Sequence, residues 1–277
     1  MKDKPVIGVL LGDSAGVGPE LVAKVLKNGE YEQYCYPVII GDVRIFERGC
    51  MIAEAEIPHC VIKDVGEADW TRGIPVLDQE DQNPDLIPLG KSSEYCGKAI
   101  INAITTAVNL CKEKKIEGFF FAPFNKTAMK LSGCPFESED YLMAHLFELT
   151  GPFGEISVLD NVIAARTTSH VPIKDVSENL TEERIMKAIK HCAKTLKQMG
   201  IQDPAIGVAA LNPHGGEEGT CGREEIEVIE PTIKKAQEQG IKAMGPYPGD
   251  TLFRRAFNGD FDGVVTMYHD QGQIALK

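Results

Sequence analysis

Short apolar runs rich in β-branched residues alternate with longer amphipathic stretches along the whole chain. This alternation is typical of α/β proteins, in which helices connect parallel strands. Several runs contain few polar residues, as expected for central strands that helices cover on both faces. The predicted strands are 6–11, 37–41, 118–122, 156–159, 162–167, 205–210 and 263–267. The predicted helices are 19–27, 95–114, 141–149, 181–199 and 224–239.

The length of 277 residues allows one large domain or two of medium size. We predict a boundary near Pro123, which gives the ranges 1–123 and 124–277. The segment 78–90 is rich in Pro, Asp, Asn and Gln and is a predicted loop or linker. Pro231 is expected to kink or split the last helix.

Composition narrows the functional class. The net charge of −12 argues against a general nucleic-acid-binding protein, which would carry a basic excess. No segment approaches the roughly eighteen uncharged apolar residues of a membrane span, and the first apolar run is too short for a signal peptide. These features predict a cytoplasmic protein. The eight cysteines are scattered without a Cys-x-x-Cys pair, which predicts free thiols.

Two turns at predicted strand ends are candidate binding sites. The first begins with Gly12 and Asp13, contains Gly16 and Gly18, and opens a predicted helix, so its backbone N–H groups suit an anion or a polar ligand. It lacks the third glycine of a Rossmann fingerprint, and a ligand-free β-to-α turn is the alternative. The second turn carries Lys126 after the strand 118–122. Ligands collect at such strand ends, although a solvated lysine is the alternative.

Three histidines share a position directly after predicted strands. His170, His214 and His269 follow the strands 162–167, 205–210 and 263–267. Three imidazoles from three strand ends can converge on one metal ion and leave a coordination position open for substrate or water. Asp250 and Asp270 are neighbouring carboxylates that could be ligands or could orient the imidazoles. The alternative for each histidine is a hydrogen-bonded structural residue.

Taken together, these segments resemble the 4-hydroxythreonine-4-phosphate dehydrogenase family over nearly the whole chain. The most specific segments are Asn212-Pro213-His214 and Tyr268-His269-Asp270-Gln271-Gly272, in this order and at this distance. The other matching segments are 12–20, 123–126, 168–172 and 249–253. The resemblance implies a fold similar to isocitrate and isopropylmalate dehydrogenases, with two α/β/α domains and an intervening cleft. It implies that 1–123 lies on the cofactor side and that 124–277 carries the metal and the dimer contacts.

The resemblance also implies ligands and residue roles. A divalent metal is expected on His170, His214 and His269, the last supplied by the neighbouring subunit of a homodimer with a shared active site. Zinc is the first expectation, and magnesium, cobalt and nickel are alternatives. The cofactor is expected to be NAD or NADP, on the turn of Gly12, Gly16 and Gly18. The expected catalytic residues are Lys126, Asp250 and Asp270. The expected contacts to a small-molecule substrate are Asp13, Glu139, Asp140, Asn212 and Lys277.

The implied reaction has two steps. The metal polarises the substrate hydroxyl while hydride passes to the nicotinamide, and it then stabilises the enolate as CO2 leaves the 3-keto acid. In the family this converts 4-hydroxythreonine 4-phosphate to an aminoketone phosphate in vitamin B6 biosynthesis. The cofactor supplies the redox chemistry, and the protein supplies orientation and electrostatics.

Two departures from the family pattern affect this expectation. Glu139 and Asp140 stand where the family carries a substrate-contacting His-Thr pair, and carboxylates would repel a phosphate. Either they face the substrate, which then differs from the parent substrate, or they face solvent. The chain also ends at Lys277, before a segment that completes the cofactor groove in family members. We therefore expect a truncated or degenerate chain, with weak cofactor binding if it is complete.

Three hypotheses follow from these observations. The first is a metal- and nicotinamide-dependent decarboxylating dehydrogenase for a four-carbon acid phosphate, or for a non-phosphorylated substrate such as a dihydrodiol. The second is a catalytically weak or silent homologue that binds a metal or another ligand. The third is a metal-dependent hydrolase, because three histidines can also activate water. The resemblance favours the first.

Overall fold

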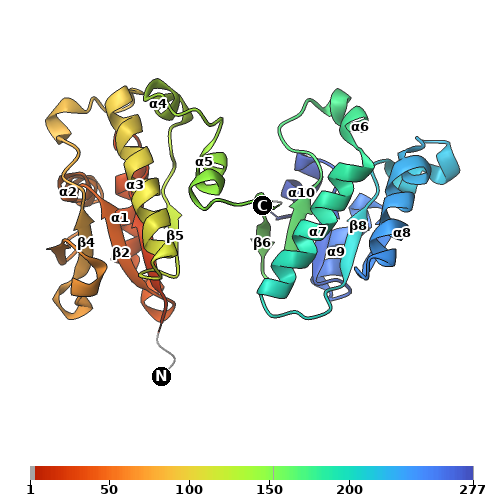
Figure 1. Ribbon diagram of the computed structural model, residues 1–277, viewed down its shortest axis with the longest axis horizontal. Helices are drawn as coiled ribbons and strands as arrows, with labels where there is room; N and C mark the ends of the chain where they lie inside the picture. Colours follow the sequence, from red (N-terminus) through yellow and green to blue (C-terminus); the bar gives the residue numbers. More distant parts are fainter. Residues whose placement is uncertain (1–3, 152, 277) are drawn as a thin grey trace. The chain divides into compact units, whose positions relative to one another are not determined.

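The computed structural model describes residues 4–151 and 153–276. The chain forms two compact units, 1–149 and 150–277, and each has a five-stranded sheet of its own (Figure 1). Each sheet carries its own hydrophobic core on both faces. The α/β class predicted from the alternation of apolar runs is therefore confirmed.

The sheet of the first unit is entirely parallel, in the order β3-β4-β2-β1-β5. Its strands are β1 (Val6–Leu10), β2 (Tyr36–Gly41), β3 (His59–Ile62), β4 (Ile74–Asp78) and β5 (Gly118–Phe121). Its α-helices are α1 (Gly18–Asn28), α2 (Val43–Ile52), α3 (Glu94–Lys112), α4 (Lys126–Leu131) and α5 (Glu139–Leu146). Four short 3-10 helices complete it: η1 (Glu30–Gln33), η2 (Val65–Glu67), η3 (Trp70–Arg72) and η4 (Pro84–Leu86).

Alternate residues of the first sheet pack against helices on opposite faces. On one face, Leu10 and Ile40 share a hydrophobic core with residues of α3 and α5, whereas on the other, Val9 and Ile39 share a core with residues of α1 and α2. This period of two is the natural consequence of strand geometry. Because both faces are covered, the strands consist almost entirely of apolar residues.

The second sheet has the order β6-β7-β10-β8-β9, and β6 alone runs antiparallel to its neighbour. Its strands are β6 (Ser157–Leu159), β7 (Val162–Arg166), β8 (Ile206–Ala209), β9 (Ala243–Tyr247) and β10 (Gly263–Thr266). Its helices are η5 (Ile173–Asp175), α6 (Val176–Asn179), α7 (Glu182–Gln198), η6 (Pro213–Gly219), η7 (Glu225–Ile229), α8 (Glu230–Glu238), α9 (Gly249–Phe257) and α10 (His269–Leu276). Helices α7 and α8 cover one face, and α9 and α10 cover the other.

The predicted elements coincide with observed ones to within a few residues. The last predicted helix is indeed split: η7 is a π-helix, and α8 follows with Pro231 in its first turn. The division between the units comes after Leu149, later than the boundary predicted near Pro123. The physical reason is that Met129 of α4 and Leu142 of α5 belong to the core around α3, so both helices stay with the first unit.

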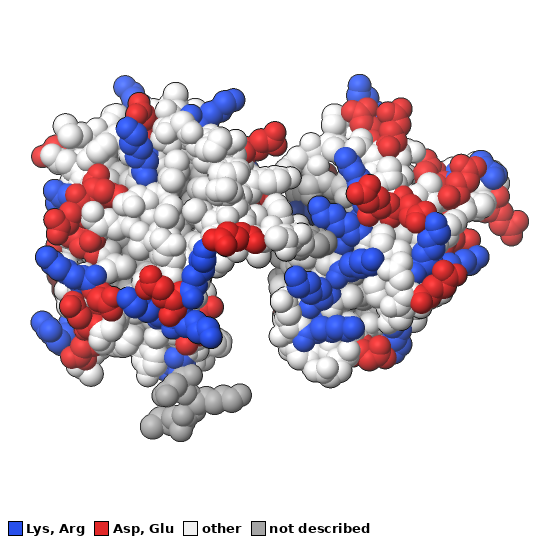
Figure 2. All heavy atoms as spheres, in the orientation of Figure 1, with Lys and Arg blue, Asp and Glu red and all other residues white. Residues whose placement is uncertain are grey.

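The surface carries charges of both signs. On the face that Figure 2 shows, Lys and Arg side chains are interspersed with Asp and Glu over each unit. The prediction of free thiols holds for all eight cysteines, none of which forms a disulfide within the part of the chain that the structure describes. No helix formed by the described residues has both the length and the apolar character that crossing a bilayer requires.

Candidate functional site

Three neighbouring strands of the second sheet deliver the three predicted histidines. Strand β10 lies between β7 and β8 and is parallel to both. His170 follows β7, His269 follows β10, and His214 follows β8. The carboxyl ends of parallel strands share one edge of the sheet, where ligands of α/β proteins collect. The topology therefore brings all three loops to the same edge.

Hydrogen bonds tie these loops together. The hydroxyl of Thr168 donates to the carbonyl oxygen of Met267 over 2.8 Å, which joins the loops after β7 and β10. The Gln271 side chain accepts from the backbone N–H of Met267 and donates to the carbonyl oxygen of Ala210, each over 2.7 Å. Gln271 thus joins the loops after β10 and β8. The sequence pattern alone gave no role to this glutamine.

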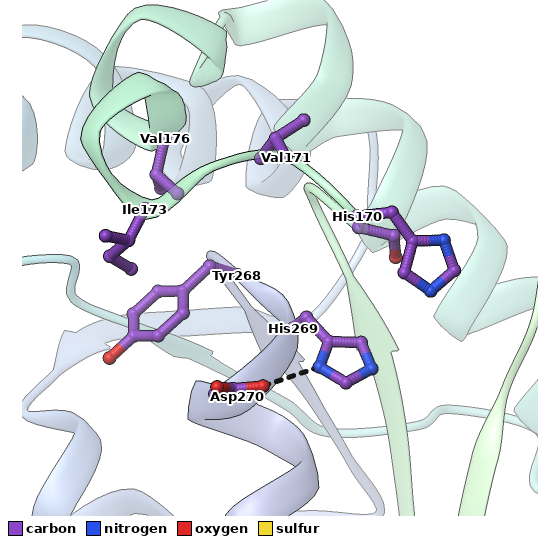
Figure 3. Close-up of a pocket in the computed structure, with 8 residues that line it drawn as sticks. His170, Val171, Ile173, Val176, Tyr268, His269 and Asp270 are labelled. Carbon is purple, nitrogen blue, oxygen red and sulfur yellow. Dashed lines mark hydrogen bonds and ion pairs between the residues drawn. The ribbon is translucent and has the colours of Figure 1, made fainter.

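A cavity of about 220 Å³ opens beside His170 and His269 (Figure 3). Its residues come from the loop after β7, from η5 and α6, and from the start of α10. The lining consists of Ser169, His170, Val171, Ile173, Val176, Tyr268, His269 and Asp270. One wall is apolar and the other carries imidazole and carboxylate groups, the mixture that small-molecule sites use.

The two imidazoles at this cavity belong to one chain and lie close together, whereas the resemblance implied that His269 would come from the neighbouring subunit. The ring centroids of His170 and His269 are 5.6 Å apart. Nδ1 of His269 lies 2.7 Å from Oδ1 of Asp270 (Figure 3). The contact with Asp270 therefore involves Nδ1 and not Nε2, the other ring nitrogen. A carboxylate on the second ring nitrogen is the usual way in which a metal-binding histidine is oriented. Asp270 is thus placed as an orienting residue.

His214 is not brought into this pair. It does not line the cavity, and the described residues contain no group of three or more His, Cys, Asp or Glu side chains that could hold a metal ion within one chain. His214 lies in an unusual turn: residues 214–218 all have positive φ, with values of 53, 73, 81, 45 and 55°. His170 also has a positive φ of 47°. Strained backbone of this kind is concentrated at functional sites.

Asn212 and Asp250 flank this edge. Both hydrogens of the Asn212 side-chain amide are used, since Nδ2 donates to Glu224 over 2.7 Å and to Glu225 over 2.9 Å. Asp250 is exposed in the first turn of α9, where the helix dipole favours a negative charge. Lys277 lies outside the described residues.

In the first unit, the two predicted turns are joined. Asp13 is buried; its N–H donates to the carbonyl oxygen of Pro123 over 3.0 Å, and its Oδ2 accepts from Asn125 over 2.9 Å. A Cβ at Gly12 would meet the carbonyl oxygen of Ala122 at 2.7 Å, and one at Gly18 would meet that of Leu11 at 2.2 Å. Close backbone packing therefore accounts for these two glycines. Gly16 has more room, its nearest neighbour lying at 3.4 Å.

Lys126 and Glu139 form an ion pair in the same unit. Their Nζ and Oε2 atoms are 3.8 Å apart, and the side chains are 58% and 23% exposed. Oε2 of Glu139 is buried without a hydrogen-bond partner among the described residues. Asp140 is exposed and accepts a hydrogen bond from Ser138. Of the two carboxylates that depart from the family pattern, Glu139 faces the predicted catalytic lysine and Asp140 faces solvent.

Comparison with known proteins decides the family. The family described as pyridoxal phosphate biosynthetic protein PdxA matches residues 33–277. The chain belongs to this family. A putative 4-hydroxythreonine-4-phosphate dehydrogenase 2 of Pseudomonas aeruginosa is 39% identical over 99% of the chain and 82% of that protein. A putative D-threonate 4-phosphate dehydrogenase of Halalkalibacterium halodurans is 35% identical over 100% of the chain and 83% of that protein.

The fold agrees with this assignment. The crystal structure of 4-hydroxythreonine-4-phosphate dehydrogenase from Klebsiella pneumoniae superposes with a TM-score of 0.90 at 29% identity, over 100% of the chain and 84% of that structure. The resemblance proposed from the sequence is therefore confirmed, and the chain has an α/β dehydrogenase fold. As a member of a family of named dehydrogenases, it is an oxidoreductase.

Proposed function

We propose that this chain is a metal-dependent, nicotinamide-linked dehydrogenase of a phosphorylated four-carbon hydroxy acid. The substrate hydroxyl carbon gives a hydride to NAD or NADP and its hydroxyl gives up a proton, and the resulting 3-keto acid loses CO2. The names of the relatives supply two candidate substrates, 4-hydroxythreonine 4-phosphate and D-threonate 4-phosphate. The observation that carries the proposal is the His170–His269 pair with Asp270, at the strand ends of a dehydrogenase fold.

The donor set fits a divalent metal. Two imidazoles that share one tetrahedral zinc ion, with metal–nitrogen distances of about 2.0–2.1 Å, place their ring centroids roughly 5 Å apart. The observed separation of 5.6 Å is close to this value. His170 and His269 would hold the ion together with His214. Because one chain does not bring the three together, we propose that a homodimer completes the site. When bound, the ion supplies Lewis-acid polarisation of the hydroxyl and keto oxygens.

The remaining roles belong to side chains of this chain. Asp270 holds the proton on Nδ1 of His269 and so directs Nε2 away from itself. Val171, Ile173 and Val176 give the cavity an apolar wall against which the carbon skeleton of a substrate can pack. Lys126 offers a cation that can hold a phosphate or carboxylate. Glu139, its ion-pair partner, competes with that anion for the ammonium group. The turn containing Gly16 offers backbone N–H groups to the cofactor.

Nicotinamide reduction tests the proposal. The full chain is incubated with NAD or NADP, with zinc, magnesium, cobalt or nickel, and with each candidate phosphate ester and a dihydrodiol. We expect the absorbance of reduced nicotinamide to appear with a phosphate ester and to depend on the metal. His170→Ala should abolish the signal, whereas His145→Ala, an exposed histidine of the first unit, should not. Metal binding without turnover on any substrate would instead identify a silent homologue.

A further inference from the structure

A buried carboxylate lies beneath the loop that carries His214. Glu225 is only 1% exposed. Its Oε1 accepts the backbone N–H groups of Leu211 and Asn212, each over 2.8 Å, and its Oε2 accepts Nδ2 of Asn212 over 2.9 Å. A buried carboxylate is costly unless hydrogen bonds satisfy it. These three donors come from the two residues that lead into Pro213 and His214, so the charge and the loop conformation depend on each other.

The contact between Glu225 and Asn212 leaves no room for a side chain at two neighbouring glycines. A Cβ on Gly216 would lie 2.6 Å from Oε2 of Glu225, and a Cβ on Gly222 would lie 2.3 Å from Nδ2 of Asn212. Both glycines have positive φ, at 81 and 129°. The loop can therefore close over the carboxylate only because two positions lack side chains. The residues before His214 thus bind Glu225 by hydrogen bonds, and Gly216 after it packs closely against the same carboxylate.

The network continues to the cavity wall. Glu224 accepts the second hydrogen of the Asn212 amide and also accepts a hydrogen bond from the hydroxyl of Ser177. Ser177 lies in α6 directly after Val176, which lines the cavity beside His170 and His269. One chain of hydrogen bonds thus runs from the cavity wall through Asn212 to the loop of His214.

The helix that carries the carboxylate is irregular at this point. Glu225 begins the π-helix η7, and regular α-helix resumes at Glu230. Isolated π turns are rare in proteins and occur often at functional sites. Here the wide turn presents the adjacent carboxylates of Glu224 and Glu225 to one amide group.

We propose that Glu225 is a positioning residue for the metal site: through Leu211 and Asn212 it holds the His214 loop in the conformation that makes the imidazole available for a divalent ion. The proposal rests on the proposed function for the role of His214. A carboxylate is required here because all three of its partners are donors. Glutamine has the same shape, but its amide nitrogen would face the Asn212 amide nitrogen, donor against donor.

Cobalt binding tests this role without turnover. The metal-free chain of 277 residues is titrated with Co²⁺ and followed by visible absorption. We expect Glu225→Gln to weaken Co²⁺ binding by about 10- to 100-fold, the range for residues that orient metal ligands. Glu227→Gln, which removes a surface partner of Arg223 from the same π-helix, should bind Co²⁺ like the wild type. Thermal unfolding of each variant is recorded in parallel.

A polarity-inverted variant separates positioning from stability. In N212D/E224Q/E225Q, a carboxylate at 212 accepts hydrogen bonds from two amides, so the contacts are restored with donor and acceptor exchanged. We expect its Co²⁺ affinity to return to within about threefold of the wild type, well inside the 10- to 100-fold loss. If Glu225→Gln does not fold, the triple variant alone tests the positioning role. Weak Co²⁺ binding by the folded triple variant would then overturn the proposal.

The outcomes distinguish the two proposals. Wild-type Co²⁺ affinity in Glu225→Gln, even with a lowered melting temperature, would overturn the positioning role and leave the proposed function intact. If the wild type binds no Co²⁺, or if His214→Ala binds it as tightly as the wild type, the proposed metal site itself fails, and the role of Glu225 falls with it.

Discussion

Nδ1 of His269 lies 2.7 Å from Oδ1 of Asp270, its immediate neighbour on the first turn of α10. Consecutive residues of a helix seldom face each other, so this contact depends on the turn with which the helix begins. It assigns the proton of the neutral imidazole to Nδ1 and leaves Nε2 as the acceptor nitrogen. The same pair lines the cavity beside His170.

Asp270→Asn should weaken metal binding without unfolding the protein, because the Asp270 side chain is 71% exposed and packs little. We expect Co²⁺ affinity to fall by about tenfold, as for other carboxylates that orient metal-binding histidines. Asp260→Asn, which removes a surface partner of Arg255, is the control and should have no effect on Co²⁺. Equal Co²⁺ affinity in both variants would mean that Asp270 does not orient the imidazole.

Glu139→Gln should improve the use of a phosphorylated substrate. The carboxylate lies 3.8 Å from the Lys126 ammonium, so it competes with any anion that Lys126 holds. Because the lysine is largely exposed, we expect KM to fall by only about threefold, consistent with an exposed pair worth ~1 kcal/mol or less. Steady-state kinetics measure this change.

Removing the charge of Lys126 should have the opposite effect and weaken binding of the phosphorylated substrate. Lys126→Met should raise KM for the phosphorylated substrate by at least about tenfold, since a charged hydrogen bond to an anion is worth roughly 1.5–3 kcal/mol. Lys130→Met, in the last turn of the same helix, is the control. Unchanged KM values in Glu139→Gln and Lys126→Met would exclude this pair from substrate binding.

Asp42 should contribute stability that depends on pH. It is 1% exposed, caps α2 through the Arg44 N–H, and pairs with the Arg44 guanidinium. Burial raises the pKa of this carboxyl, but hydrogen bonds from the Arg44 side chain and from the N–H groups of Gln82 and Arg44 outweigh burial, so the pKa lies below its ordinary 3.8. A lowered folded-state pKa means that the stabilisation is fully present above the unfolded-state pKa, near 3.8, and is lost as pH falls through the folded-state pKa.

Asp42→Asn should therefore lower the free energy of unfolding by about 1–3 kcal/mol near neutral pH. The difference from the wild type should shrink at pH values below 3.8, as the wild-type carboxyl becomes protonated. Urea denaturation near neutral pH and below pH 3.8 measures the free energy of unfolding of both proteins. The same difference at the two pH values would mean that the Asp42 carboxylate is not the source of the stabilisation.

Cys192 should resist alkylation in the folded protein. It lies on the core-facing side of α7, and burial raises the pKa of its thiol to about 12, so almost no thiolate is present at neutral pH. The exposed Cys221 provides the internal comparison. With iodoacetamide and mass spectrometry, we expect Cys221 to be modified in the native state and Cys192 only at the rate of unfolding. Rapid native modification of Cys192 would contradict its burial.

Long apolar runs made the central strands predictable, whereas short or interrupted ones escaped prediction. β1, β7 and β10 are nearly uninterrupted apolar segments. β4 and β9 contain prolines, and β3 has only four residues and begins with a histidine. Their strand character depends on pairing with neighbours, which no local pattern records.

Part of the candidate site could likewise be predicted from the sequence, and part could not. Histidines that follow strands could be placed at one sheet edge, because parallel strands share their carboxyl ends. Glu225 was not predicted, because its burial depends on the π turn and on the loop folded over it. One signal was present: it lies four residues before the buried Ile229, so a carboxylate occupies the apolar stripe of its helix.

X-ray absorption at the zinc edge tests the central claim most directly. The full chain is loaded with one equivalent of zinc, and the coordination shell is compared with those of His170→Ala, His214→Ala and His269→Ala. We predict three imidazole nitrogens at about 2.0–2.1 Å in the wild type and the loss of one in each variant. A shell dominated by sulfur, or one that none of the three substitutions alters, would contradict a metal site built from these histidines.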